Sequence, residues 1–402
     1  MAKKPNIRFA GFEDDWEQRK LPEFVSFFNG LTYTPDDVRK TGTLVLRSSN
    51  VKNGEIIDAD NVYVSEKVAT SENVQVGDII VVVRNGSRAL IGKHAQIKAF
   101  MPNTVIGAFM SGIRSEHPSF VNALLDTSAF ECEIAKNMGA TINQITGYMF
   151  SKMEFTIPSE EEQKKIGDYF RNLDHLITLH QRKCDELKKV KKFMLQKMFP
   201  KKGEKNPEIR FDGFTNDWEQ RKFSELYAKS SEKNDGSIGM DRNITVATMQ
   251  FKEDVKVSTA EYLKTYYTFN LGDIAFEGHQ SKEFRYGRFV ENDIGNGIVS
   301  HIFAVFRPIK EFDLQFWKYA INNEMLMQRI LSRSTKASTM MHDLVTEDFL
   351  NEIFLVPSLN EQKQIGTYLK SIDHLITLHQ RKCEELKNVK KYMLQNMFAK
   401  GE

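Results

Sequence analysis

The sequence predicts a mixed α/β (α+β) fold, in which two mixed α/β domains are joined by two long antiparallel coiled-coil helices with a pseudo-twofold internal duplication. Three observations predict it. The string DHLITLHQRKC occurs at 174–184 and again at 373–383. The segments around both copies carry a heptad pattern of apolar residues. The residues between them mix short strand-like and helix-like patterns.

The duplication extends beyond this string. Residues 158–199 align without gaps on 357–398, identical at 30 of 42 positions. Two short leaders, 5–20 and 207–222, are identical at 12 of 16 positions. The middles between these pieces show little similarity. The domain boundaries that follow are 1–157 and 203–356 for the two α/β domains, and 158–202 and 357–402 for the two conserved helices.

Each 42-residue segment is predicted to form one long helix. Ser159 and Ser358 are followed three residues later by Glu162 and Glu361, which is the signature of a capping box. A helix of ~40 residues would be ~60 Å long, which suits a coiled coil better than one small core. An antiparallel pair of such helices would bring Cys184 towards His379 and His180 towards Cys383.

The predicted helix-pairing seam follows alternating spacings of four and three residues. A zinc site built from its histidines and cysteines is one interpretation. We prefer the other, in which these are mildly polar seam residues that fix the register, because no C-x₂-C spacing is present. We therefore expect no metal. The central seam residues are Ile177, His180, Cys184, Leu187, Ile376, His379, Cys383 and Leu386.

The two middles share a plan. In the first, the pattern predicts a strand at 79–83, a polar turn at 84–88, a strand at 89–92 and a helix at 119–138. In the second, it predicts a strand from Ile274, a long polar loop, a strand at 298–308 and a helix at 312–331. The middles differ most in their polar loops, which favours loops as the place where specificity resides. Simple drift between duplicates is the alternative.

Catalytic motifs are missing. GSRALIGKH at 86–94 resembles a phosphate-binding loop, but five residues precede Gly-Lys where four are required, and His94 follows. We find no HExxH, no GxSxG and no Asn/Asp-Pro-Pro-aromatic motif. We therefore expect no catalytic centre and no cofactor bound by this chain. No apolar run reaches eighteen residues, and three sparse cysteines favour a cytoplasmic protein.

The paired WEQRK leaders, the two diverged domains and the two copies of P-S-x-x-EQ…DHLITLHQRK together resemble the specificity subunit of type I restriction–modification systems. Gly77-Asp78-Ile79 and Gly272-Asp273-Ile274 also stand where such recognition domains begin a strand. The resemblance covers essentially the whole chain, and it is carried by the organisation more than by any one motif.

The resemblance implies a non-catalytic subunit of a complex that cleaves DNA or methylates adenine at N6. Each middle would read one half of an asymmetric, bipartite site in double-stranded DNA. The helices would set the gap between the half-sites and dock two methyltransferase subunits, and the assembly would recruit two restriction (motor-nuclease) subunits. S-adenosylmethionine, ATP and Mg would bind those partners.

Candidate DNA-reading residues are the Arg, Lys, Asn, Gln, Ser, Thr and His side chains of the polar loops, because these reach base edges and phosphates. In the first domain they are Arg47, Ser48, Asn50, Arg84, Asn85, Ser87, Arg88, Lys93, Thr141 and Asn143. In the second they are His279, Gln280, Ser281, Lys282, Arg285, Arg288, Thr335, Lys336 and Ser338. The alternative for each of them is a side chain in a solvated loop.

Charge sets an expectation for binding strength. Residues 21–157 carry a net charge of −2 and 223–356 one of −4, whereas 158–206 carry +5. Acidic recognition domains neutralise few phosphates, so we expect the chain alone to bind DNA weakly. The competing reading is a non-enzymatic coiled-coil scaffold that presents two protein-binding domains. A nuclease is a third reading, disfavoured because no paired-carboxylate or metal motif is present.

Overall fold

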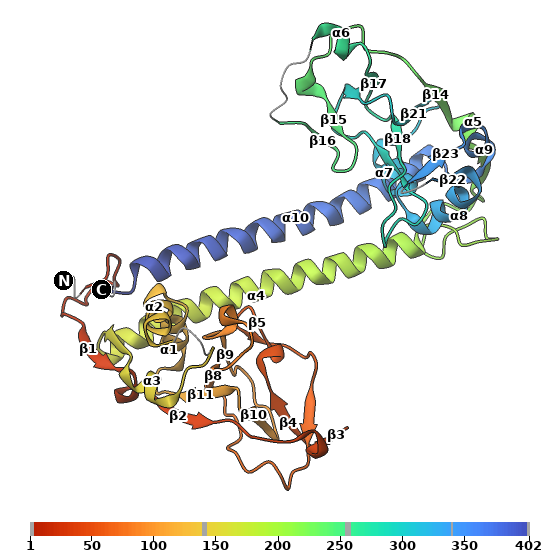
Figure 1. The fold of residues 1–402 in the computed structure, drawn as a ribbon. Helices are drawn as coiled ribbons and strands as arrows, with labels where there is room; N and C mark the ends of the chain where they lie inside the picture. The colour runs from red at the N-terminus through yellow and green to blue at the C-terminus, as the bar shows by residue number, and fades with distance from the viewer. Residues whose placement is uncertain (1–3, 139–142, 254–258, 339–340, 400–402) are drawn as a thin grey trace. The chain divides into compact units, whose positions relative to one another are not determined.

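The structure, a computed structural model, describes residues 4–138, 143–253, 259–338 and 341–399 (Figure 1). The chain divides into two compact units, the first made of Met1–Gln181 with Arg381–Glu402 and the second of Arg182–Gln380. Each unit contains one diverged middle and part of both long helices, α4 (Glu160–Lys197) and α10 (Leu359–Asn396). None of the helices in the described ranges is long and apolar enough to cross a membrane.

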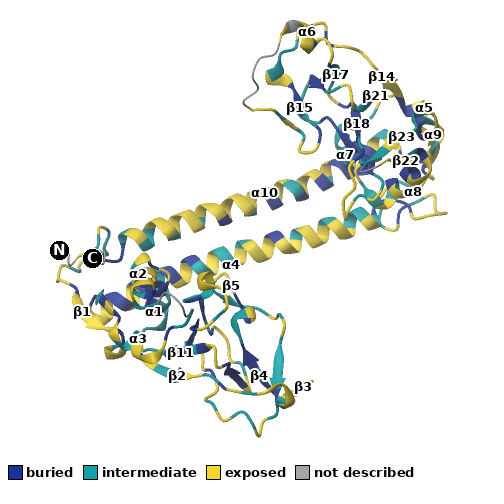
Figure 2. Ribbon diagram, viewed as in Figure 1, coloured by how far each residue is buried: buried dark blue, intermediate teal, exposed yellow. Residues whose placement is uncertain are grey.

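The first unit is built on an antiparallel sheet in which the β-branched strand Ile79–Val82 is buried on both faces (Figure 2). Its order is β2 (Ser26–Asn29), β11 (Met110–Arg114), β8 (Ile79–Val82) and β9 (His94–Gln96). A second sheet has the order β10 (Thr104–Ile106), β4 (Thr43–Leu46), β7 (Val62–Val64) and β3 (Val38–Arg39). The remaining strand pairs are β5 (Val51–Lys52) with β6 (Glu55–Ile56), and β1 (Glu17–Lys20) with β12 (Glu154–Ile157).

Helices α1 (Pro118–Leu125), α2 (Ser128–Asn137) and α3 (Gly147–Lys152) complete the first unit. The sequence predicted one helix over 119–138, and this was wrong. The hydroxyl of Thr127 accepts a hydrogen bond from the Phe130 amide, so a second helix begins there. The predicted strand at 89–92 was also wrong, because Arg88–Leu90 forms a 3-10 helix and the strand is β9.

The second unit repeats the plan with the antiparallel order β14 (Tyr227–Ser230), β21 (Ala304–Pro308), β18 (Ile274–Glu277) and β19 (Arg288–Glu291). Its strand pairs are β13 (Glu219–Lys222) with β24 (Ile353–Val356), β15 (Ile244–Thr245) with β16 (Gln250–Phe251), β17 (Tyr267–Phe269) with β20 (Gly297–Val299), and β22 (Thr335–Ala337) with β23 (His342–Leu344). Its shorter helices are α5 (Phe223–Leu226), α6 (Ala260–Leu263), α7 (Leu314–Ile321), α8 (Glu324–Ser334) and α9 (Thr346–Asn351).

Two elements predicted as continuous in the second unit are interrupted. The helix predicted at 312–331 is α7 followed by α8, because the Asn323 side chain accepts a hydrogen bond from the Met325 amide and caps the second helix. The strand predicted at 298–308 is β20 followed by β21. A turn separates them, closed by a 3.1 Å hydrogen bond from the Phe303 amide to the Ser300 carbonyl.

Each leader is anchored to the start of a long helix. Arg8 donates two hydrogen bonds to the Glu162 carboxylate, and the Trp16 indole N–H donates a third. The predicted capping box requires the Glu162 carboxylate to accept a hydrogen bond from the Ser159 amide. This part of the prediction was wrong, because the carboxylate binds the leader instead. Arg210 and Trp218 hold the Glu361 carboxylate in the same way, and there the amide of Glu361 still donates to the Ser358 hydroxyl.

The long helices pair antiparallel within the first unit. Lys390 Nζ lies 2.7 Å from Asp174 Oδ1, and Cys383 Sγ lies 3.9 Å from the Ile177 carbonyl. Residue numbers therefore rise along α10 in the direction in which they fall along α4. Lys390 also pairs with Asp126 at 2.7 Å, which ties α10 to the end of α1.

The second unit shows the same pairing with its own residues. Lys191 Nζ lies 2.6 Å from Asp373 Oδ1, which are the repeat equivalents of Lys390 and Asp174. The Tyr319 hydroxyl donates to the same carboxylate, so this ion pair connects both helices to α7. Cys184 packs against Ile372 and Ile376.

Candidate nucleic-acid interface

Four separate stretches of the first unit meet at one end of its main sheet. The Asn85 side-chain amide donates to the Ser48 hydroxyl at 3.2 Å, and Lys93 Nζ donates to the Ser48 carbonyl at 3.3 Å. The Asn143 amide donates to the Gly86 carbonyl at 3.1 Å. Most of the candidate residues chosen from the sequence of this domain are therefore neighbours in space.

Two of these candidates serve the loop itself. Asn50 is fully buried, and its amide donates to the Ala59 carbonyl and to Asn61. Its side chain does not reach the surface in this conformation, and we leave it out of the proposed reading set. Arg47 donates to the Asp60 carboxylate at 2.7 Å, so DNA would have to compete for this guanidinium. Thr141 lies outside the described residues.

The remaining candidates of this domain point to solvent. Arg84, Ser87 and Arg88 are exposed. The Arg84 guanidinium lies over the ring of Phe109, 5.2 Å from its centroid. Phe109 was not among the predicted residues, and it is an exposed aromatic side chain at the centre of this loop cluster.

In the second unit, the loop 278–287 and the β22–β23 hairpin come together. The His342 amide donates to the Gly278 carbonyl at 2.8 Å, and a bridge joins His279 to Met341. The rings of Tyr286 and His342 meet edge to face at 5.4 Å. Both groups of residues predicted for this domain therefore belong to one surface.

Some candidate side chains of this surface are exposed, and others are already hydrogen-bonded within the domain. His279, Gln280, Lys282, Arg285 and Lys336 are exposed. By contrast, Arg288 donates to Glu277 at 2.8 Å and to the Ala247 carbonyl. The other hydroxyl candidates are used locally. The Ser281 hydroxyl closes a turn, the Thr335 hydroxyl donates to the Leu331 carbonyl, and the Ser338 hydroxyl donates to the Met341 carbonyl.

Behind each surface, an ion pair with a buried carboxylate fixes the start of the central strand. Asp78, just before β8, accepts two hydrogen bonds from Arg114. Asp273, just before β18, accepts two from Arg307. Burial raises the pKa of Asp273, and Arg307 opposes this only in part. The Gly-Asp-Ile motifs therefore position the central strands. They stand at the start of these strands, whereas the candidate loops follow the strand ends.

The predicted seam residues lie along the facing sides of α4 and α10. Some residues directly after a seam position contact the α/β domain of their own unit. Thr178 donates to Glu55 at 3.0 Å, and the Leu195 carbonyl accepts from Asn323. All eight seam residues are buried or half-buried: Ile177, His180, Cys184, Leu187, Ile376, His379, Cys383 and Leu386.

Eight large apolar residues stand directly before positions of the seam, which continues through 191, 194, 390 and 393, and all eight are exposed. We call them the apolar flank. In an antiparallel pair, equivalent flanks of the two helices lie on the same side, away from the contacts that Thr178 and Leu195 make with the α/β domains. Their exposed fractions lie between 41% and 57%. The first unit contributes Leu176, Leu179, Val389 and Tyr392, and the second contributes Val190, Phe193, Leu375 and Leu378.

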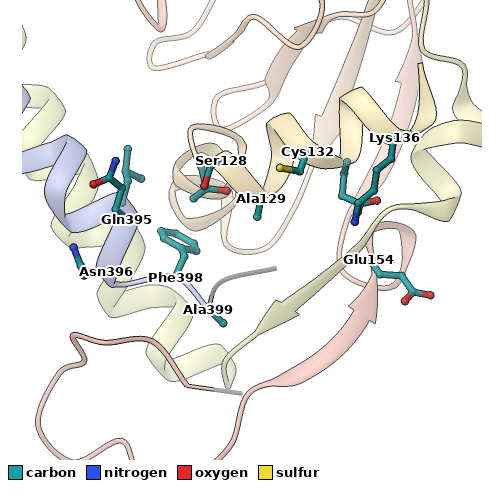
Figure 3. Close-up of a pocket in the computed structure, with 12 residues that line it drawn as sticks. Ser128, Ala129, Cys132, Lys136, Glu154, Gln395, Asn396, Phe398 and Ala399 are labelled. Atoms are coloured by element: carbon teal, nitrogen blue, oxygen red, sulfur yellow. The ribbon is translucent and has the colours of Figure 1, made fainter. Parts of the chain in front are cut away.

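A cleft of about 400 Å³ lies elsewhere in the first unit, between α2 and the end of α10 (Figure 3). Its lining includes Cys132, Lys136, Glu154 and Phe398. No group of three or more His, Cys, Asp or Glu able to hold a metal ion occurs within residues 4–138, 143–253, 259–338 and 341–399. The described surface therefore offers loops and helix flanks as its candidate functional features.

Comparison with known proteins assigns both repeats to one family. Residues 13–189 and 215–388 each match the type I restriction modification DNA specificity domain. The specificity subunit of the type I restriction enzyme StySPI from Salmonella potsdam is 26% identical over 39% of this chain and 35% of its own length. The MjaVIII specificity subunit from Methanocaldococcus jannaschii is 25% identical over 67% of this chain and 66% of its own length.

The matched regions therefore span about a third and just under two thirds of these two relatives. The fold is similar to the crystal structure of the type I restriction-modification system S subunit from M. genitalium. That likeness has a TM-score of 0.62 and covers 99% of this chain and 100% of the other, at 12% identity. At this identity the likeness concerns the fold.

Proposed function

The chain belongs to the family of type I restriction modification DNA specificity domains, and from this we propose that it is the subunit that reads an asymmetric, bipartite DNA target. Each recognition domain reads one half-site. The chain positions two methyltransferase subunits, and through them two motor-nuclease subunits, for N6-adenine methylation or restriction. S-adenosylmethionine, ATP and Mg bind those partners, so that this chain contributes recognition and assembly without a catalytic centre.

One observation carries the proposal: both units use the same sheet order but place different side chains on the loops at the equivalent sheet end. Arg84 in the first unit and His279 in the second occupy the same place, directly after the central strand and paired to the segment before a short helix. Base edges are distinguished by the donors and acceptors of side chains. Two domains with the same sheet order but different loop side chains therefore suit two half-sites of different sequence.

Two of the candidate arginines are not free to neutralise a phosphate. Arg47 and Arg288 are already paired with acidic groups, so phosphate neutralisation by this chain is limited. Non-specific affinity depends mostly on phosphate contacts. The partner subunits therefore supply much of the backbone binding, while this chain supplies sequence choice.

The apolar flank supports partner docking. Each unit carries two leucines together with a valine and an aromatic residue on the helix side that its recognition domain leaves open. Exposed apolar side chains gathered on one face are typical of protein interfaces. Because the same residue types recur in both units, the flank suits two copies of one partner.

A non-enzymatic scaffold with two protein-binding domains is the second candidate function, favoured by the acidic net charge of both domains. Selection from random double-stranded DNA, with the chain in complex with its methyltransferase, separates the two. The proposal predicts enrichment of two different half-sites at a fixed gap. Enrichment of no sequence by an intact complex would support the scaffold.

A further inference from the structure

A matching turn precedes the same strand in both units. In the first, the Met110 amide donates to the Gly107 carbonyl at 2.8 Å; in the second, the Phe303 amide donates to the Ser300 carbonyl at 3.1 Å. The third residue of these turns is Phe109 in one and Ile302 in the other. They are 57% and 73% exposed. Two recognition domains of little sequence similarity thus expose a large apolar side chain at the same place.

Turn chemistry does not explain these residues. Turns favour Gly, Asn, Asp, Ser and Pro, each for a backbone reason, and an apolar side chain at the tip gains no burial. Ile302 is largely exposed and lies outside β21, so a polar residue there would leave the core intact. A role outside the fold accounts for both positions better than folding does.

The turn in the first unit is held firmly. The Val83 and Arg84 amides both donate to the Phe109 carbonyl, at 3.0 and 3.2 Å, and the Gly107 amide donates to the Leu46 carbonyl at 2.9 Å. Gly30 packs so closely that a Cβ there would lie 2.0 Å from the Gly107 oxygen. An exposed side chain on a fixed backbone is pre-organised to contact a ligand at little entropic cost.

The surroundings identify the class of ligand. The Arg84 guanidinium covers one side of the Phe109 ring, and Arg84 is bridged to Gln144. In the second unit, β18 ends and β21 begins at the same sheet end, so the turn with Ile302 lies beside the start of the polar loop 278–287. An apolar tip among cationic and amide side chains suits DNA, whose bases offer methyl groups and stacking faces.

We propose that Phe109 and Ile302 are the apolar base contacts of the two recognition domains, one for each half-site. The inference rests on the proposed DNA-reading function and adds specificity-determining residues to it. The ligand surface is the apolar part of the bases. It is met either at a thymine methyl group or at a base step into which the side chain inserts, as Phe and Ile do in other DNA complexes.

The test uses the full chain in complex with its methyltransferase and the target found by methylation mapping. Affinities of the Phe109→Ala and Ile302→Ala variants are measured for the target and for targets altered in one half-site. Each change is expected to reduce discrimination about 5- to 150-fold at its own half-site only, as expected for the loss of one base contact. Phe100→Ala, in the loop between β9 and β10, and Ile309→Ala, directly after β21, remove exposed apolar side chains outside the two turns. Neither should change discrimination.

Two modified DNAs then distinguish the base surfaces. Uracil in place of thymine should weaken the wild-type complex but not the variant if a methyl group is contacted. 2-Aminopurine beside the step should brighten with the wild type only if the side chain inserts. Equal loss at both half-sites, loss of complex assembly, or insensitivity to both modified DNAs would overturn the inference. A wild-type complex that recognises no target would instead contradict the proposed function.

Discussion

Arg8 and the fully buried carboxylate of Glu162 form a two-pronged ion pair, with hydrogen bonds of 2.7 and 2.8 Å, that joins the leader to the first turn of α4. Arg210 and Glu361 repeat this geometry in the second unit. A buried carboxylate without its partner is costly, because the charge cannot recover its hydration. The leaders are therefore structural parts of the units.

Replacing Arg8 by Met should destabilise the first unit by about 3–5 kcal/mol, because Glu162 remains buried and unpaired. Arg8→Met combined with Glu162→Gln should restore much of that loss, because the neutral amide oxygen still accepts from the Trp16 indole N–H. Hydrogen exchange of each unit in the intact chain measures both. The second unit serves as the internal control, and an equal loss in the single and double variants would show that the ion pair is not the cause.

Glu291, at the end of β19, gives the second unit a dependence on pH. Burial, with the charges of Asp293 and Asp313, raises the pKa of Glu291 well above its ordinary 4.5, and Lys318 opposes this. A raised folded-state pKa means that the protonated form is favoured. The stabilisation that protonated Glu291 gives to the folded second unit is complete below a pH of about 4.5. It is lost as the pH rises through the folded-state pKa.

Glu291→Gln should therefore raise the melting temperature of the second unit at neutral pH and flatten its decline between acidic and neutral pH. Gln96 occupies the equivalent ladder position in the first unit, opposite Ile79 as Glu291 is opposite Ile274. Thermal unfolding of both proteins across pH provides the measurement. A variant whose pH profile parallels the wild type would contradict this account of Glu291.

Charges on the apolar flank should block partner docking without unfolding the helices. Leu179→Glu lies in the first unit and Leu378→Glu in the second, and both residues are 52% exposed. Each single variant should bind one methyltransferase subunit, and the double variant none, as measured by native mass spectrometry. Lys189→Glu, an exposed position off the flank, should still bind two. Two bound subunits in the double variant would place docking elsewhere.

Arg88→Ala and Arg285→Ala should act on different half-sites, since the two exposed guanidiniums belong to different recognition surfaces. Each change should cost about 1–3 kcal/mol if the side chain contacts a base. Competition binding with singly altered targets separates the half-sites. A uniform loss across both would instead assign phosphate contact or a folding role to these residues.

The sequence predicted the features that depend on periodicity. The long helices and the shared plan of the two middles follow from heptads and from the duplicated segments. It missed the features that depend on local side-chain competition. Thr127 and Asn323 start new helices inside apolar patterns by capping an amide, and Glu162 pairs with a leader that is distant in sequence.

The candidate surfaces were predicted in outline only. Polar loop residues were a sound guide to which loops meet, but composition does not show which side chains are occupied. Asn50 and Arg288 look like reading residues in the sequence, yet Asn50 holds its own loop and Arg288 is paired with Glu277 on the neighbouring strand. Phe109 and Ile302 were missed because an apolar residue beside a strand is indistinguishable from core until its exposure is known.

The most direct test of the central claim is to express the chain with its methyltransferase in a host that lacks adenine methylation and to map N6-methyladenine across that genome. We predict one bipartite motif with two different half-sites at a fixed gap, present only when both proteins are made. An intact complex that leaves no such motif would contradict DNA reading by this chain and leave the scaffold as the better account.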